Sequence, residues 1–119
     1  MSKAIKIYHN PRCSKSRETL SLLQSTGAEP EVVLYLETPA DAATLCQILH
    51  MLGMSSAREL MRQKEDLYAS LNLADSNLSE EALIQAMVEN PKLMERPIVV
   101  ANGQARIGRP PEQVLEIIG

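Results

Sequence analysis

Residues 4–36 read AIKIYHNPRCSKSRETLSLLQSTGAEPEVVLYL, and this stretch decides the fold. Apolar and polar side chains alternate over residues 4–8, which predicts a strand. The Asn-Pro pair at 10–11 ends this strand, because proline has no amide to donate to a sheet ladder. Residues 14–26 have helical spacing and stop before a glycine, and the continuous apolar run 32–36 is typical of a buried strand. Together these segments predict a right-handed parallel βαβ unit.

The middle of the chain, about residues 37–96, is predicted to contain helices and no strand. Leucine and isoleucine recur at helical spacing over residues 45–52, and a glycine follows. Serines begin a second predicted helix over residues 55–62 and a third over residues 79–90, which an Asn-Pro pair stops. No strand pattern interrupts this segment, so we expect a helical insertion.

The end of the chain returns to strands. Residues 97–101 and 104–107 are short strand-like runs, and the Asn-Gly pair between them is a strong signal for a type I′ hairpin. Two prolines at 110–111 then open a final helix. The predicted order βαβ, helices, ββα is an α/β, thioredoxin-like arrangement with a helical insertion between its two halves. We expect residues 1–119 to form a single domain.

Composition excludes several classes of protein. The chain has 119 residues, of which 45% are hydrophobic and 23% charged, as in an ordinary globular protein. A net charge of −3 and only three tyrosines argue against nucleic-acid binding. No apolar run approaches the roughly 20 residues of a membrane span. We see no signal peptide, and two cysteines do not make a secreted disulfide framework, so we expect a cytoplasmic protein.

Cys13 is the first candidate for chemistry, because it lies where the first strand gives way to a helix. A helix N-terminus has free amides and about half a positive charge, which stabilise an anion. Arg12, Lys15 and Arg17 add positive charge within a few positions. Such a setting lowers the pKa of a thiol. We therefore predict a reactive thiolate in preference to a cysteine buried for packing.

For two residues near Cys13 in sequence, the pattern leaves two possible roles open. His9 could tune the thiolate or pass a proton, or it could be a simple turn residue. Ser16 makes the motif CxxS instead of CxxC, and its hydroxyl could bond the sulfur or merely cap the helix. With no second cysteine in this motif, a redox cycle needs an external thiol.

Other cysteine, histidine and arginine residues are weaker candidates for a functional site. We interpret Cys46 as a packing residue, with a resolving thiol as the alternative, and His50 as solvent-exposed. The histidines and cysteines lack the spacing of a zinc site, so no metal is predicted. Arg58 and Arg62, at positions i and i+4, are expected to share a helix face.

Two further arginines each stand directly before a proline, at the junctions that open the strand at 97–101 and the last helix. Arg96 precedes Pro97, and Arg109 precedes Pro110. Such junctions hold a side chain more firmly than a helix surface does. The planar guanidinium group is always charged and binds tetrahedral oxyanions.

Residues 9–17, HNPRCSKSR, resemble the HNPxCxxSR signature of the glutaredoxin-coupled arsenate reductases. The similarity continues in order and spacing over residues 34–37, 58–62, 96–100 and 106–110, and so covers nearly the whole chain. The family has a thioredoxin-like fold with a helical insertion, in agreement with the pattern of elements above. It commonly has a cis proline after the second arginine, which makes Pro97 a candidate.

The resemblance implies roles for individual residues. Cys13 would be the nucleophile, and arsenate and then arsenite would be bound by a basic triad: Arg62, Arg96 and Arg109. His9 would tune the thiolate, while Asn10 and Ser16 would order the loop and hydrogen-bond the sulfur. Arg58 is not the catalytic arginine of the family, although it is close to Arg62 in sequence.

The implied activity is the reduction of arsenate to arsenite through a single cysteine. No bound cofactor is implied; glutathione would be a co-substrate, and glutaredoxin a transient partner. Two alternatives remain open from the sequence. One is a related thiol oxidoreductase that acts on another oxyanion or on a glutathionylated protein. The other is a non-catalytic regulator of the same fold that binds RNA polymerase, although such regulators usually carry CxxC and this chain has CxxS.

Overall fold

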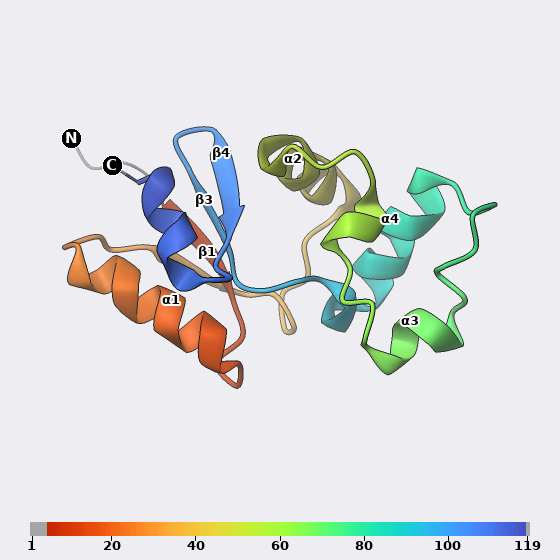
Figure 1. Ribbon diagram of the computed structural model, residues 1–119, viewed down its shortest axis with the longest axis horizontal. Helices are drawn as coiled ribbons and strands as arrows, with labels where there is room; N and C mark the ends of the chain where they lie inside the picture. Colours follow the sequence, from red (N-terminus) through yellow and green to blue (C-terminus); the bar gives the residue numbers. More distant parts are fainter. Residues whose placement is uncertain (1–4, 119) are drawn as a thin grey trace. The chain divides into compact units, whose positions relative to one another are not determined.

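The computed structural model describes residues 5–118 (Figure 1). Ala4, which the sequence places in the first strand, lies outside these residues. Contacts along the chain group it into two compact units, Met1–Thr38 with Arg96–Gly119 and Pro39–Glu95. The second unit spans nearly the segment in which the sequence predicts a helical insertion. That the whole chain forms a single domain stays a prediction.

Within the described residues, the first unit is built on a four-stranded sheet of order β2-β1-β3-β4. The strands are β1 (Ile5–His9), β2 (Glu31–Leu34), β3 (Ile98–Ala101) and β4 (Gln104–Ile107). Strand β1 is parallel to β2 and antiparallel to β3, which is antiparallel to β4. Helix α1 (Ser14–Ser25) joins β1 to β2, and the 3-10 helix η3 (Pro111–Glu116) follows β4. The predicted thioredoxin-like order of elements is confirmed.

The hairpin between β3 and β4 is the one that the sequence predicts (Figure 1). Asn102 has φ 56° and Gly103 has φ 73°, and a type I′ turn requires positive φ at both of these positions. The Asn102 side chain also donates a 2.6 Å hydrogen bond to the carbonyl of Ile117. This bond ties the turn to the end of η3.

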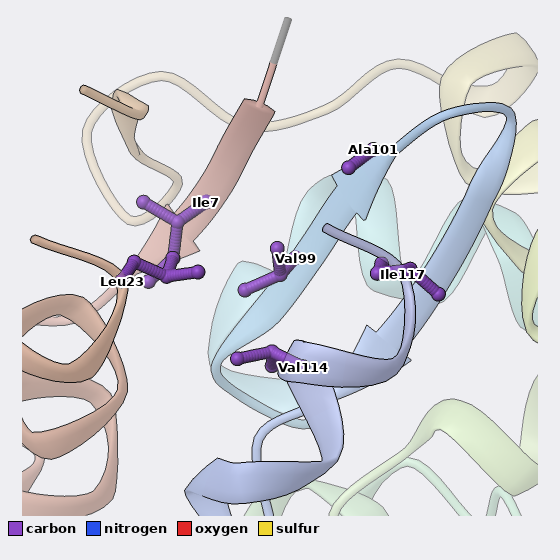
Figure 2. Close-up of a cluster of buried hydrophobic side chains, with 6 residues drawn as sticks. All are labelled: Ile7, Leu23, Val99, Ala101, Val114 and Ile117. Atoms are coloured by element: carbon purple, nitrogen blue, oxygen red, sulfur yellow. The ribbon is translucent and has the colours of Figure 1, made fainter. Parts of the chain in front are cut away.

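The chain has no Phe or Trp, and the main hydrophobic cluster of the first unit is aliphatic; the buried aromatic side chains of this unit are Tyr8 and Tyr35. Figure 2 shows side chains from β1, α1, β3 and the η3 segment directed toward one another. The buried members of this cluster are Ile7, Leu23, Val99, Ala101, Val114 and Ile117. Because α1 and η3 contribute to one cluster over the sheet, the N-terminal end of α1 has a fixed place in the unit.

Two features of the first unit differ from the sequence prediction. The run 32–36 is predicted to be a buried strand, but β2 is an edge strand, and Val32 and Leu34 are 42% and 37% exposed. A continuous apolar run does not distinguish a central strand from an edge strand. The final helix is present, but it is a 3-10 helix, with bonds such as Gln113 N–H to the Pro110 carbonyl (3.1 Å).

In the second unit, the described residues form helices and an isolated strand-like bridge. Its elements are α2 (Ala42–Leu52), η1 (Ala57–Leu60), α3 (Asp66–Ser70), α4 (Glu80–Glu89) and η2 (Pro91–Leu93). Gly53 ends α2 in the left-handed region (φ 73°), and Ser79 caps α4 by accepting from the Ala82 amide at 3.1 Å; both signals are predicted from the sequence. No helix within residues 5–118 has the length and apolar character needed to cross a membrane.

The predicted helix over residues 55–62 is wrong in its extent. A capping box starts η1, but the helix ends at Leu60, and the Arg62 amide donates to the Leu93 carbonyl at 2.6 Å. Arg58 and Arg62 therefore do not share a helix face. Contacts with residues 93–95 accompany the early end: the Glu95 amide donates to the Leu60 carbonyl at 2.8 Å, so this carbonyl does not continue the helix. Arg58 donates to the Leu73 and Asp75 carbonyls at 3.0 Å each.

The packing role predicted for Cys46 is also wrong. Cys46 is exposed, whereas Leu45, Ile48 and Leu49 form the buried stripe of α2. A residue one position after a buried residue is turned by about 100° around the helix axis, and at Cys46 that turn leads out of the stripe. His50 is exposed, as predicted.

The aliphatic cluster yields a stability prediction. Leu23→Ala should lower the free energy of unfolding by about 2–5 kcal/mol, because it leaves a cavity in a fully buried site. Leu115→Ala is the matched control, since Leu115 is 37% exposed, and it should cost about 0.5 kcal/mol. Urea unfolding at constant m-value measures both, and equal losses would contradict this view of the core.

Candidate functional site

The loop that carries Cys13 is held by its own backbone and by Asn10. Cys13 is the N-cap of α1, with φ −96° and ψ 124°. Its amide donates to the Asn10 carbonyl at 3.0 Å, and its carbonyl accepts from the Arg17 amide at 3.0 Å. The Asn10 side chain accepts from the Arg12 amide at 3.0 Å, which closes the turn. The sulfur is therefore presented at the helix N-terminus by a fixed turn.

Opposing effects act on the pKa of the half-buried Cys13 thiol. Burial is the largest of them and raises the pKa, but the Ser16 amide, the charge of Arg96, the Lys15 amide and a hydrogen bond from Arg96 lower it. The net result is a pKa below the ordinary thiol value. The amides of α1 act on the sulfur without the geometry of a full capping hydrogen bond. The structure thus favours the thiolate, as the sequence predicts.

Two arginines from β-strand junctions meet at this sulfur. The Arg109 Nη2 group donates to Cys13 Sγ at 3.7 Å, and its Nε group donates to the Arg96 carbonyl at 2.8 Å. The Arg96 guanidinium also stabilises the thiolate form of this sulfur, yet its Nε and Nη1 atoms are buried with no hydrogen-bond partner among the described residues. A buried donor without a partner is unfavourable. These donors are available to an anionic ligand.

Arg62 belongs to the Pro39–Glu95 unit. Its Nη1 atom pairs with Glu65 at 3.0 Å, and about a third of the side chain is exposed. Its participation in the site that contains Cys13 stays a prediction.

His9 and Ser16 form a buried pair below the loop. Ser16 Oγ lies 2.6 Å from His9 Nδ1 and accepts from the Asn10 amide at 3.0 Å. Burial, and then the charge of Arg17, lower the pKa of His9, so its imidazole is neutral at pH 7. In the neutral imidazole, the tautomer sets which of the two groups donates in this bond. The Ser16 hydroxyl is thus engaged with His9 and Asn10, and it is the Ser16 amide that acts on the sulfur.

Gly108 is a site residue that sequence reasoning missed. It is buried, its amide donates to the Pro97 carbonyl at 3.0 Å, and a Cβ at this position would collide with the Thr19 side chain and lie 2.9 Å from Pro97 Cγ. Only glycine allows this close approach, which seats Arg109 beside α1. A glycine before an Arg-Pro pair is the sole signal in the sequence, and it indicates no particular neighbour.

Both arginine–proline junctions of the site have cis peptide bonds. The Arg96–Pro97 bond is cis, as the family resemblance implies, and the Arg109–Pro110 bond is a second one that was not predicted. Within residues 5–118, no group of three His, Cys, Asp or Glu side chains could hold a metal ion. Cys13 and Cys46 are both free thiols.

Comparisons with known proteins show which family the chain is similar to. The sequence profile described as the ArsC family matches residues 8–117. The Escherichia coli K12 protein named "Uncharacterized protein YfgD" is 83% identical over 119 residues, 100% of each chain. An arsenate reductase of Neisseria meningitidis strain MC58 is 53% identical over 96% of this chain and 97% of its own. The solved arsenate reductase of Vibrio cholerae has 58% identity and a TM-score of 0.96, with 98% and 99% of the two chains covered.

The electrostatics of Cys13 can be tested by alkylation with iodoacetamide at a series of pH values, in a Cys46→Ser background. We expect the reaction to persist at pH values where an ordinary thiol is protonated, and to cease as pH falls through the lowered pKa. Arg96→Ala should raise the pKa, because it removes a cation and a donor. Arg106→Ala is the control, since Arg106 pairs with Glu116 at 2.9 Å, and it should leave the profile unchanged.

The role of Gly108 can be tested with Gly108→Ala. We expect a loss of about 1–3 kcal/mol of stability from overpacking and, because Arg109 is displaced, a higher pKa of Cys13. Thr19→Ala removes the nearest colliding atoms, so adding it to Gly108→Ala should restore part of both losses. A Gly108→Ala variant with the wild-type pH profile would show that this glycine does not position Arg109 at the Cys13 sulfur.

Proposed function

Because this chain belongs to the ArsC family, we propose that it is an arsenate reductase that uses Cys13 as its nucleophile, glutathione as its reductant and glutaredoxin as a transient partner. The observation that carries the proposal is the convergence of Arg96 and Arg109 on the Cys13 sulfur. A nucleophile and cations that bind an oxyanion must be adjacent for this chemistry, and both are present in one compact unit.

The two buried donors of Arg96 support an oxyanion substrate in particular. An unpartnered buried donor costs about 1–3 kcal/mol, and a ligand that accepts from it removes this cost. Tetrahedral arsenate offers several oxygens to a planar guanidinium fork. Arg109 and the N-terminus of α1 add positive charge on the same side. In our proposal, Arg62 is the third arginine of the binding set.

The first chemical step is attack by the Cys13 thiolate on arsenic. A sulfur–arsenic bond forms, an arsenic–oxygen bond breaks, and the oxygen leaves as water after protonation. Negative charge on the arsenate oxygens is stabilised by the arginines, as in an oxyanion hole. The product is a thioester-like Cys13–arsenate adduct in which arsenic is still As(V).

The second step is the reduction. The thiolate of glutathione attacks the Cys13 sulfur, and a sulfur–sulfur bond forms while the sulfur–arsenic bond breaks. The electron pair of the broken bond stays on arsenic, which becomes As(III) and leaves as arsenite. Cys13 remains as a mixed disulfide with glutathione.

The third step regenerates the enzyme. A thiolate of glutaredoxin attacks the glutathione sulfur of the mixed disulfide, and Cys13 leaves as a thiolate. A leaving group with a low pKa departs more readily, so the arginine and amide donors around Cys13 help this step as well. Only one protein cysteine is needed, in agreement with the CxxS motif.

The buried pair beneath the loop has a supporting role in this proposal. Ser16 and Asn10 order the loop, and His9 tunes the thiolate indirectly, by holding Ser16 and with it the start of α1 in place. The reaction uses no resident metal or cofactor, and neither nucleic acid nor membrane takes part. Because glutathione is abundant in reducing compartments, we propose a cytoplasmic location.

The proposal is tested by NADPH consumption with glutathione, glutathione reductase, glutaredoxin and arsenate. Cys13→Ser should reduce turnover to background, whereas Cys46→Ser should retain it, because Cys46 is exposed on α2. Arg96→Ala should lower kcat/KM for arsenate roughly 100- to 1,000-fold, the loss typical of one oxyanion donor. Arg62→Ala should raise KM for arsenate if the third arginine is correctly assigned.

Other outcomes favour the two alternatives. Turnover with a different oxyanion or a glutathionylated protein, but not with arsenate, would keep Cys13 as the nucleophile and change the substrate. Binding to RNA polymerase without any turnover would favour a regulator. Full activity of Cys13→Ser would eliminate the mechanism altogether.

A further inference from the structure

A partly enclosed pocket of about 230 Å³ lies beside the Cys13 loop. Residues 9–12 form one wall, and Leu34, Leu36 and Glu37 form the other. All of them belong to the first compact unit. Its volume is below the about 300–1,000 Å³ of pockets that enclose drug-sized ligands. A small, extended molecule suits it better than a nucleotide cofactor.

The parallel pairing of β1 and β2 creates this pocket. His9 is opposite Leu34 in the register, so both strands end at the same edge of the sheet. The chain after β1 turns toward Cys13, and the chain after β2 turns through a bond from the Glu37 amide to the Leu34 carbonyl (2.9 Å). The two turns therefore face each other, and one of them leads directly into the nucleophile.

Both kinds of charge and an apolar surface meet in the pocket. Arg12 and Glu37 are exposed, and neither side chain has a hydrogen bond or ion pair among the described contacts of residues 5–118. Leu34 and Leu36 are 37% and 38% exposed, although a strand of this composition is expected to be buried. In this pocket the two leucines are adjacent, and an apolar surface with a polar rim is found in ligand-binding grooves.

We propose that this pocket binds the glutathione that attacks the Cys13 adduct, with a carboxylate of the tripeptide on Arg12 and its γ-glutamyl ammonium on Glu37. Leu34 and Leu36 would contact the methylene groups between these ends. This inference rests on the proposed function, because it assigns the place of the reductant in that reaction.

The position of the pocket suits the chemistry. Arg12 and Cys13 are consecutive, so their Cα atoms are about 3.8 Å apart. Cys13 itself does not line the pocket. In this proposal the cysteine of the tripeptide, between its charged ends, lies at the rim of the pocket next to Arg12 and turns from there toward the Cys13 sulfur. The arginines of the oxyanion site, Arg96 and Arg109, do not line this pocket. Reductant and arsenate therefore occupy separate places around Cys13.

The test uses S-methylglutathione, a probe that cannot react, and the backbone amide NMR spectrum of the full chain. We expect titration to shift the amides of residues 9–12 and 34–37, whereas arsenate alone should shift those around Cys13 and Arg96. Glu37→Gln and Arg12→Ala should each weaken binding of the probe roughly fivefold, as expected for one partly exposed charge pair. Glu31→Gln is the matched control, because Glu31 is an exposed carboxylate on β2 outside the pocket.

Kinetics provide the second readout. In the coupled assay, Glu37→Gln should raise KM for glutathione by the same factor and leave KM for arsenate unchanged. Probe-induced shifts elsewhere, or wild-type affinity in both pocket variants, would overturn the proposal. So would shifts at 34–37 caused by glutaredoxin and not by the probe. If wild type has no arsenate turnover, the proposed function fails, while the NMR titration still decides whether the pocket binds the tripeptide.

Discussion

The close approach of Gly108 to Thr19 and Pro97 joins the three segments on which the site depends. Thr19 belongs to α1, whose N-terminus presents Cys13; Pro97 follows Arg96; and Gly108 precedes Arg109. Since no side chain separates these segments, both guanidinium groups can reach one sulfur. The aliphatic cluster beneath keeps α1, β3 and η3 in contact, so the approach is supported by packing (Figure 2).

Opposing electrostatic effects determine the pKa of Cys13. Burial of the Cys13 sulfur opposes ionisation, and the amides of α1 together with Arg96 reverse that effect. Groups that stabilise the thiolate are also groups that can bind an oxyanion. Two N–H groups of Arg96, on Nε and Nη1, have no hydrogen-bond partner among the described residues. A folded protein that buries unpartnered donors gives up stability at that point, which is common where a ligand is to be bound.

The pocket beside the Cys13 loop lies at the edge of the sheet, next to β2. Strand β2 pairs only with β1, and its Val32 and Leu34 side chains are exposed. The turns after β1 and β2 line a small pocket next to the loop. In the proposed function, the oxyanion is bound at the arginine-bearing strand junctions, and glutathione in the pocket at the ends of the parallel strands. The two proposed reactants would then approach Cys13 from different sides of its loop.

The sequence by itself determined the order of the four strands with α1 between the first two, the position of Cys13 at a helix N-terminus and the Asn102-Gly103 hairpin, because these features depend on local chemistry: side-chain alternation, caps and turn residues. The short helices α3 and η2 were not predicted. Only the tertiary structure decided that β2 lies at the edge, that η1 ends before Arg62 and that Gly108 must be a glycine. Each of these depends on which segment, distant in sequence, packs against the residue. The spacing of residues along the chain does not specify such tertiary contacts.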